Sequence, residues 1–212
     1  MPPRRSYDQY CSAARALDLV GDRWTLLIVR ELLAGPRRYT DLHADLPGVS
    51  TDVLASRLKD MERDGLTTRR RLPPPGVVYV YELTWRGRGL LPVLQALGAW
   101  GEVALGERRP TDAVRAHWFA LPLLRGLESC GNAGLVEVRL EEGGFHVRVG
   151  AVGEGPVYGD GPAPEEPDVR LSLSGEVSGA IGRGELSVRD AVRLGRVEVV
   201  GEGALAKELR DA

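Results

Sequence analysis

The sequence predicts an α+β chain with two domains, at residues 1–108 and 109–212. In the first part, apolar residues recur at helical spacing, and only one pair of runs is typical of strands. In the second part, several runs alternate apolar and polar residues, as strands with one buried face do. The charge also changes, because the first part has 16 Lys and Arg against 13 Asp and Glu, and the second has 12 against 17. A basic half followed by an acidic half suggests that only the first meets a polyanion, unless the difference is chance variation of surface charge.

The composition is that of a globular protein with an ordinary core. Of the 212 residues, 43% are hydrophobic and 27% are charged. No apolar run is long enough to span a membrane, and the opening "MPPRRSYDQY" lacks an apolar segment behind its arginines. We therefore expect a cytoplasmic protein with neither a membrane contact nor a signal peptide. Cys11 and Cys130 are far apart, so we expect no disulfide framework, no metal site and no cofactor.

The first three predicted helices lie between Cys11 and Leu46. Leu17 and Val20 mark the first helix, and the second follows a Gly-Asp-Arg turn and carries Trp24, Leu27, Ile28 and Leu32. Gly35-Pro36 ends the second helix. "RRYTDLHADL" then predicts a short third helix that Thr40 caps and that buries Leu42 and Leu46.

The fourth predicted helix, "STDVLASRLKDMERDGL", runs from Ser50 to Leu66. Leu54, Leu58 and Met61 form one apolar stripe that faces a core. Ser50 is suited to cap the first turn, and Gly65 to take the left-handed position after the last. Asp52, Ser56, Lys59 and Arg63 fall on the opposite, polar face.

A hairpin follows, because "LTTRRRL" and "VVYVYEL" read as two strands bridged by "PPPG". We expect arginines at its base and prolines at its tip. The order of helices, recognition-type helix and hairpin is typical of a winged helix-turn-helix, in which the second helix of the motif enters the DNA major groove and the wing meets the backbone or minor groove. The alternative is a small helical core with a solvated hairpin. The candidate DNA-binding residues are Tyr39, Thr40, Ser50, Thr51, Asp52, Ser56, Arg57, Lys59, Arg69, Arg70 and Arg71.

The segment after the hairpin predicts a dimer helix. Pro92 rules out an unkinked helix from Thr84 onward, so we expect a turn at "TWRGRG" and a helix from near Leu90. Apolar residues then recur every three or four positions and include a large exposed Trp100. The alternative is that this helix packs on the second domain. The candidate dimer residues are Leu90, Leu94, Leu97 and Trp100.

From about Cys11 to Glu102 the chain resembles the HxlR-type winged-helix transcriptional regulators. The motifs that carry the resemblance are "GDRWTLLIVRELLAGPRRYTDL", "LPGVSTDVLASRLKDMERDGL" and "VYELTWRGRGLLPVLQALGAWG". The resemblance implies a homodimer that binds double-stranded DNA, with the first helix and the helix after the wing forming most of the dimer contact. Ser12 stands where the family commonly has Pro, which changes a cap.

Beyond Arg109, "PTDAVRAHWFALPLLRGLE" predicts a helical entry, followed by strands around Val136, Phe145, Val169 and Val197. Their alternation predicts an antiparallel sheet that helices cover on one side. Ser187 and Asp190 form a capping box for a helix that Gly195 ends. "GEGPVYGDGPAPEEP" reads as a surface loop.

The second half resembles the sterol-carrier fold through "PDVRLSLSGEVSGAIGRGELSVRDAVRLGRVEVVGEG". That resemblance implies an apolar tunnel between sheet and helices that binds an apolar small-molecule effector. The alternative is that the same residues simply fill a core. The candidate ligand-binding residues are Trp118, Phe119, Val138, Phe145, Val147, Leu171, Ile181 and Val197.

No catalytic motif joins the three histidines, the cysteines or any serine, so we expect no enzyme. Cys11 is the one reactive candidate, because a helix start makes a thiol more acidic, and in some relatives the matching Cys is a redox sensor. The alternative is a small buried apolar residue. Two functions remain open: a dimeric transcription regulator with a hydrophobic effector, and a lipid or hydrophobic-metabolite carrier whose winged helix mediates protein association.

Overall fold

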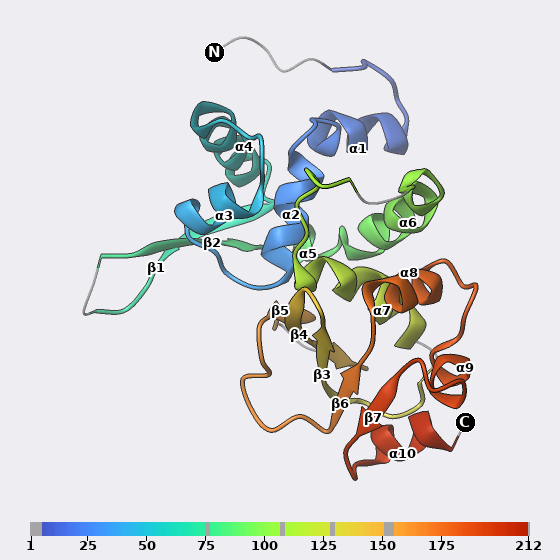
Figure 1. The fold of residues 1–212 in the computed structure, drawn as a ribbon. Coiled ribbons are helices and arrows are strands. Elements are labelled where there is room, and N and C mark those ends of the chain that lie inside the picture. Colours follow the sequence, from blue (N-terminus) through green and yellow to red (C-terminus); the bar gives the residue numbers. More distant parts are fainter. Residues whose placement is uncertain (1–5, 75–76, 107–108, 128–129, 151–154, 212) are drawn as a thin grey trace. The chain divides into compact units, whose positions relative to one another are not determined.

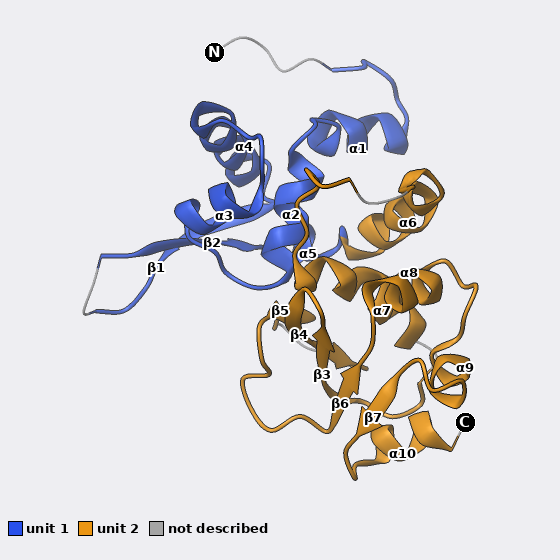
Figure 2. Ribbon diagram, viewed as in Figure 1, with its two compact units in different colours: residues 1–90 blue, residues 91–212 orange. Residues whose placement is uncertain are grey.

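The computed structural model describes residues 6–74, 77–106, 109–127, 130–150 and 155–211. The chain divides into two compact units, here called unit 1 (Met1–Leu90) and unit 2 (Leu91–Ala212; Figure 2). The division falls before the helix that follows the wing. The boundary that we expected, at residue 108, lies outside the described residues.

Unit 1 has the predicted order of helices and hairpin (Figure 1). Its elements are α1 (Ser12–Val20), α2 (Thr25–Leu33), α3 (Tyr39–Asp45), α4 (Thr51–Arg63), β1 (Thr67–Arg71), β2 (Tyr79–Leu83) and α5 (Trp85–Arg88). The core combines Ile28 and Leu32 of α2 with Leu42 of α3 and with Leu54 and Leu58 of α4, all at most 3% exposed. The winged helix-turn-helix prediction is confirmed.

Local chemistry sets the ends of α3 and α4. The Ser50 hydroxyl accepts a hydrogen bond from the Val53 N–H, and Gly65 takes a positive φ of 69°, as predicted for α4. The predicted cap of α3 is wrong, because α3 begins at Tyr39 and Thr40 lies inside it. The Asp41 carboxylate accepts the Arg38 backbone N–H at 3.3 Å, which fixes the helix start earlier than Thr40.

The arginines of the wing lie toward its tip, whereas we expected them at its base. Thr67 pairs with Leu83 at the base, and Arg71 pairs with Tyr79 at the far end of the ladder. Thr67 and Leu83 are both buried, and a charged guanidinium group is rarely buried without a partner. The base of the hairpin is therefore unsuited to arginine. The predicted proline tip includes Pro75 and Gly76, which lie outside the described residues.

The wing is held against the helices of unit 1 by hydrogen bonds and by close packing at a glycine. Arg37 and Tyr81 exchange two backbone hydrogen bonds, of 3.0 and 2.8 Å. The Thr84 hydroxyl donates to the Gly65 carbonyl at 2.6 Å and caps α5. A Cβ at Gly87 would lie only 2.1 Å from the Leu66 carbonyl oxygen, so only glycine fits at this position of the predicted turn.

Unit 2 is a five-stranded sheet with helices. Its strands are β3 (Gly134–Leu140), β4 (Gly143–Val149), β5 (Tyr158–Asp160), β6 (Val169–Ser172) and β7 (Glu198–Val200), in the order β5-β4-β3-β6-β7. Its helices are α6 (Leu91–Gly101), η1 (Glu102–Ala104), η2 (Ala116–Phe119), α7 (Ala120–Leu127), α8 (Gly175–Gly182), α9 (Val188–Arg193) and α10 (Ala204–Arg210). Helix α7 packs on α8 and on β4.

Two predictions for this sheet are wrong. The pairing of β3 with β6 is parallel, so the sheet is mixed and not antiparallel throughout. Alternation of side chains predicts which face is buried but not the direction of the neighbouring strand. Strand β5 lies inside the predicted surface loop, where the surrounding glycines and prolines hide a short run around the fully buried Tyr158.

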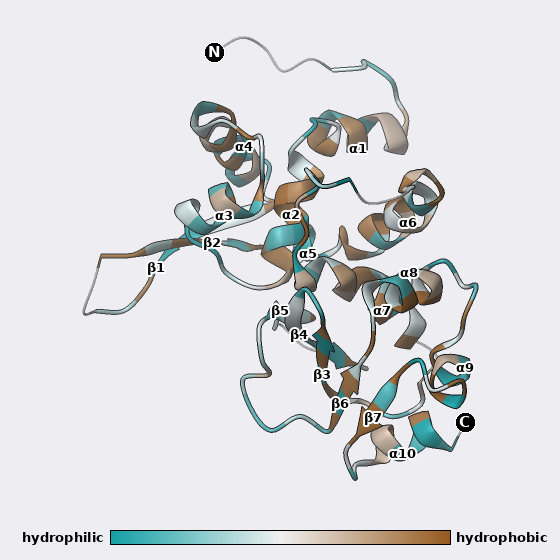
Figure 3. Cartoon of the chain, in the orientation of Figure 1, coloured by the Kyte–Doolittle hydropathy of each residue, from teal (hydrophilic) through white to brown (hydrophobic). Residues whose placement is uncertain are grey.

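The alternating residues of unit 2 form its core. Val138 of β3, Phe145 and Val147 of β4 and Leu171 of β6 are completely buried. Hydrophobic and hydrophilic residues alternate along these strands in Figure 3. The Ser187 hydroxyl accepts the Asp190 N–H at 2.9 Å, which is one half of the predicted capping box, and Gly195 has the expected positive φ, whereas α10 was not predicted. The sterol-carrier resemblance of this unit stays a prediction. Within the described ranges, no helix has the length and apolar character needed to cross a membrane.

Candidate nucleic-acid interface

The polar face of α4 is open to solvent. Thr51, Asp52, Ser56 and Lys59 are exposed, while the stripe on the other side of the helix is buried. The ammonium group of Lys59 makes no ion pair with any residue that the structure describes. Hydroxyl, carboxylate and ammonium groups in this arrangement are suited to hydrogen bonding with base edges.

Tyr39 connects the two helices of the motif. Its hydroxyl donates to the Thr51 carbonyl oxygen at 2.7 Å, and its ring stacks on His43 with centroids 6.5 Å apart. We predicted a DNA contact for Tyr39, and the structure places it where it fixes the first turn of α4 against α3. Thr40 is exposed beside it, and its hydroxyl lies 3.3 Å from the Asp41 carboxylate.

Arg57 is held by two carboxylates. Its guanidinium group pairs with Asp22, in the turn between α1 and α2, and with Asp60 at 2.8 Å one turn further along α4. Asp60 also pairs with Arg63 at 2.9 Å. We call Asp22, Arg57 and Asp60 the α4 clamp. Because Arg57 already has carboxylate partners, its place favours orientation of α4 over a contact with phosphate.

The three arginines of the wing have different surroundings. Arg69 lies over the Tyr79 ring, with its guanidinium carbon 4.1 Å from the centroid. The Nε–H of Arg70 is shared between the two carboxylate oxygens of Glu82, at 3.1 and 3.2 Å. The charge of Arg70 is therefore partly neutralised. Arg71 is exposed. Arg69 and Arg71 share one face of the strand, because their positions are two residues apart.

The structure therefore assembles most of the predicted DNA-binding residues on α4 and the wing of one unit. Sequence reasoning missed Asp22, Tyr79 and Glu82, which decide how three of the arginines are held. Asp22 stands in the Gly-Asp-Arg turn, but nothing in the sequence couples it to a residue 35 positions away.

Comparisons with known proteins identify relatives of the first half of the chain. Residues 19–109 match the HxlR-like helix-turn-helix family. YvaP of Bacillus subtilis, an uncharacterized HTH-type transcriptional regulator, is 38% identical over 86 residues, which are 41% of this chain and 80% of YvaP. The chain belongs to the HxlR-like helix-turn-helix family. The HTH-type transcriptional regulator YodB of the same organism is 37% identical over 87 residues, 41% of this chain and 78% of YodB. The structure of reduced YodB is 32% identical and covers 48% of this chain and all of YodB, with a TM-score of 0.41.

In this HxlR-like chain, α6 begins at Leu91, close to the predicted start, and directly after Leu90. Leu94 is buried in unit 2, where α6 packs on α7, as the alternative for this helix expected. Leu97 remains 45% exposed and Trp100 80% exposed. One side of α6 therefore packs within unit 2, and the side that carries Trp100 is exposed.

The predicted ligand-binding residues form the interior of unit 2. Val138, Phe145, Val147 and Leu171 are completely buried, Ile181 and Val197 are 3% exposed, and Trp118 and Phe119 are half-buried. Of the eight, only Ile181 borders either of two open surface hollows in the described part of the chain. The first, of about 230 Å³, is lined by Arg125, Gly126, Ile181, Gly182, Gly184, Leu186 and Ser187. The second, of about 470 Å³, is lined by Ala133, Gly134, Leu135, Arg148, Val149, Glu165, Glu166 and Asp168.

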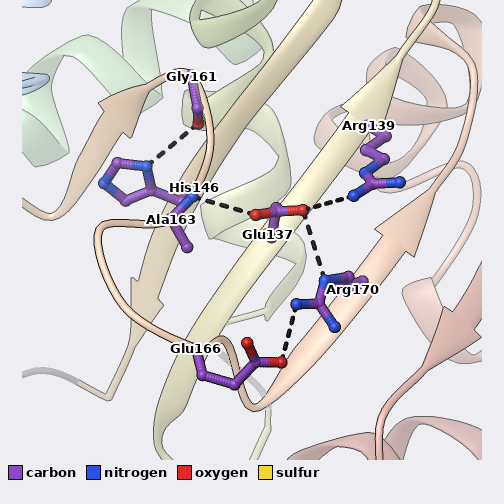
Figure 4. A network of polar contacts seen from close by, with 7 residues as sticks. All are labelled: Glu137, Arg139, His146, Gly161, Ala163, Glu166 and Arg170. Carbon is purple, nitrogen blue, oxygen red and sulfur yellow. Dashed lines mark hydrogen bonds and ion pairs between the residues drawn. The ribbon is translucent and has the colours of Figure 1, made fainter.

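A polar network on the sheet of unit 2 is satisfied by its own members (Figure 4). The Glu137 carboxylate accepts from the Ala163 N–H at 3.1 Å and pairs with Arg139 and Arg170. The Ala163 N–H, followed by these arginines, lowers the pKa of Glu137. The network fastens the segment after β5 to the sheet, and we assign it no ligand. No group of three or more metal-binding side chains occurs among the residues described.

Cys11 is exposed at the residue before α1, so the alternative of a buried apolar residue does not apply. The backbone N–H groups of Ala14 and Ala13 lower the pKa of its thiol. Cys130 is half-buried, and burial raises the pKa of its thiol.

We expect the α4 clamp to appear in a double-mutant cycle of Asp22→Asn and Arg57→Met. Each single variant removes the same ion pair, so the loss in the double variant should be smaller than the sum of the two single losses. The coupling should be about 0.5–1 kcal/mol, measured from the unfolding of unit 1 in urea. Lys59→Met removes one positive charge from the same helix and should show no coupling to Asp22→Asn. Additive losses at Asp22 and Arg57 would contradict the clamp.

Cys11 should be alkylated by iodoacetamide in a lower pH range than Cys130. The thiolate is the reactive form, so the rate at each site follows its own pKa. Mass spectrometry of the two cysteine peptides after timed labelling at several pH values gives both profiles. Coincident pH profiles would show that the helix start does not acidify Cys11.

Proposed function

We propose that this chain regulates transcription as a homodimer that binds double-stranded DNA with α4 and the wing. Membership of the HxlR-like family supports a DNA-binding transcriptional regulator. The observation that carries the proposal is the combination of a buried apolar stripe on α4 with an exposed row of Thr51, Asp52, Ser56 and Lys59. A folded helix of this kind, next to a hairpin with exposed arginines, presents base-reading and phosphate-binding groups on one unit.

In this proposal Ser56 and Lys59 face base edges, and Arg69 and Arg71 meet phosphates. Arg70 is a weaker candidate, because Glu82 competes with phosphate for its guanidinium group. Arg57 and Tyr39 orient α4. The protein acts by binding in the cytoplasm, and catalysis has no part in the proposal.

The homodimer is supported by the uncovered side of α6. Exposed tryptophan on a helix is costly in water, and a second copy of the helix is a partner that can cover it. In a two-fold symmetric dimer, each copy presents the same patch to the other, and the two recognition helices read the halves of an inverted repeat about 34 Å apart.

A small-molecule effector bound by unit 2 remains part of the proposal. Most of the eight residues that we expected to line its pocket are packed in the core of unit 2. The surface hollows are therefore the places where a ligand can bind. The competing function, a hydrophobic-metabolite carrier, needs an enclosed apolar cavity, and neither hollow is enclosed by that core. The polar face of α4 also speaks for regulation.

Contacts to phosphate and contacts to bases can be distinguished by their effects on sequence specificity. On DNA from the region around its own gene, Arg71→Ala should weaken binding almost equally for all sequences and reduce the slope of log affinity against log salt by about 1. Lys59→Ala should instead reduce discrimination between operator and random DNA, by about 1–3 kcal/mol for a good base contact. Arg139→Ala, on the sheet of unit 2, is the control with the same charge change. Wild-type behaviour of both Arg71 and Lys59 variants in gel-shift titrations would refute this placement.

The role of α6 in dimerisation can be tested by measuring the molar mass of the protein in solution. Leu97→Ala combined with Trp100→Ala should convert the protein to monomers, because two of the large exposed apolar side chains of α6 are removed. Multi-angle light scattering of the full chain measures this directly, and Trp85→Ala, an exposed tryptophan on α5, is the matched control. A dimer of unchanged mass would place the contact elsewhere.

A further inference from the structure

A carboxylate of the chain is buried against α8. Glu102 of η1 has a side chain only 10% exposed, and its Oε1 lies 3.2 Å from Nη1 of Arg183, the residue after α8. Burial raises the pKa of Glu102, and the charges of Arg183 and Arg125 oppose that effect. The carboxylate is therefore partly removed from water and held by cationic side chains.

Helix α8 makes room for this carboxylate at Gly179, where a Cβ would lie 3.0 Å from Glu102 Oε1. At Gly182 a Cβ would meet the Pro122 Cβ at 2.3 Å, and Glu102 Oε2 lies 3.5 Å from the same position. Any larger residue at Gly179 would crowd the carboxylate or push it away from Arg183. The surface of α8 thus has the shape and charge of a carboxylate site, and η1 is its present occupant.

The hollow of about 230 Å³ between α7 and the end of α8 adjoins this site. Gly182 borders both the Glu102 carboxylate and the hollow. The hollow is lined by the apolar side chains of Ile181 and Leu186 and by Arg125 of α7. A cationic group beside an apolar floor matches a small organic anion better than a purely apolar lipid.

We propose that this hollow binds a small carboxylate with a compact apolar body. The apolar body lies against Ile181 and Leu186, and the carboxylate pairs with Arg125. There it lies near the Glu102 carboxylate, which repels it, because Gly182 borders both the hollow and Glu102. A carboxylate suits this place better than a phosphate, because the group already seated on α8 is a carboxylate.

Repulsion of Glu102 gives the ligand a route to the rest of the chain. Glu102 directly follows α6, and its pairing with Arg183, which also pairs with Glu185 at 2.9 Å, fastens the end of that helix to α8. A bound carboxylate that repels Glu102 weakens this fastening, and α6 is connected through α5 to the wing. This regulatory consequence rests on the proposed function, whereas the binding itself does not depend on DNA.

The test uses the full chain without DNA and sodium benzoate as the probe, with benzamide as its neutral isostere. Ionic strength is held constant by replacing sodium chloride with benzoate. Benzoate should raise the melting temperature saturably, because it binds the folded state, and benzamide should raise it much less. Arg125→Gln should abolish the shift due to benzoate. Arg148→Gln, which removes an arginine from the second hollow, should leave it unchanged.

The decisive variant is Glu102→Gln, which removes the repelling charge while keeping the side chain's size. It should bind benzoate at least about fivefold more tightly in calorimetric titration, as expected when a like charge beside the bound carboxylate is lost. Equal binding of benzoate and benzamide, a shift abolished by Arg148→Gln but not by Arg125→Gln, or unchanged affinity in Glu102→Gln would each overturn the proposal. The absence of saturable benzoate binding to the wild-type protein would overturn it as well. Loss of DNA binding in the gel-shift experiments would leave these results unaffected, so the two proposals fail separately.

Discussion

The burial of Leu54, Leu58 and Met61 along one side of α4 is the constraint on which the DNA-facing surface depends. A helix repeats every 3.6 residues, so fixing this stripe in the core fixes which residues face solvent. Rotation of α4 by one residue would replace a buried leucine by a polar group, at a cost of several kcal/mol. The hydrogen bond of Tyr39 to the start of α4 and the ion pair of Arg57 with Asp22 then oppose smaller displacements. The packing and polar contacts of unit 1 therefore fix which face of α4 is exposed.

Charge on this surface is distributed unequally among residues that look alike in the sequence. Arg57 and Arg70 are held by carboxylates of their own unit, whereas Arg71 and Lys59 are exposed. An arginine with a carboxylate partner must give up that partner to bind phosphate, so its net contribution to affinity is small. In the proposed complex this limits nonspecific attraction to DNA, and the exposed charges of Lys59 and Arg71 lie on α4 and toward the tip of the wing.

The sequence predicts unit 1 well because its signals are local. Helical spacing places Leu54 and Leu58, a hydroxyl at Ser50 marks the helix start, and Gly65 marks its end. The sequence predicts less where a feature depends on residues far away in the chain. The Asp22–Arg57 pair joins residues 35 positions apart, and the direction of β6 is set by its neighbour in the sheet. Strand β5 was missed because three residues between glycines and prolines have too little periodicity to be recognised. Alternating apolar residues were expected to line a pocket, but alternation is the same for a lined pocket and a filled core. Only packing distinguishes the two.

We propose that α4 and the wing form the DNA-binding surface of this HxlR-like protein. Amide hydrogen exchange of the full chain, with and without DNA from the region around its own gene, tests it most directly. Complex formation should slow exchange in the peptides covering Thr51–Lys59 and the described part of the wing, and leave the β3–β4 hairpin of unit 2 unchanged. Slowed exchange confined to unit 2, with no change along α4 and the wing, would contradict the account.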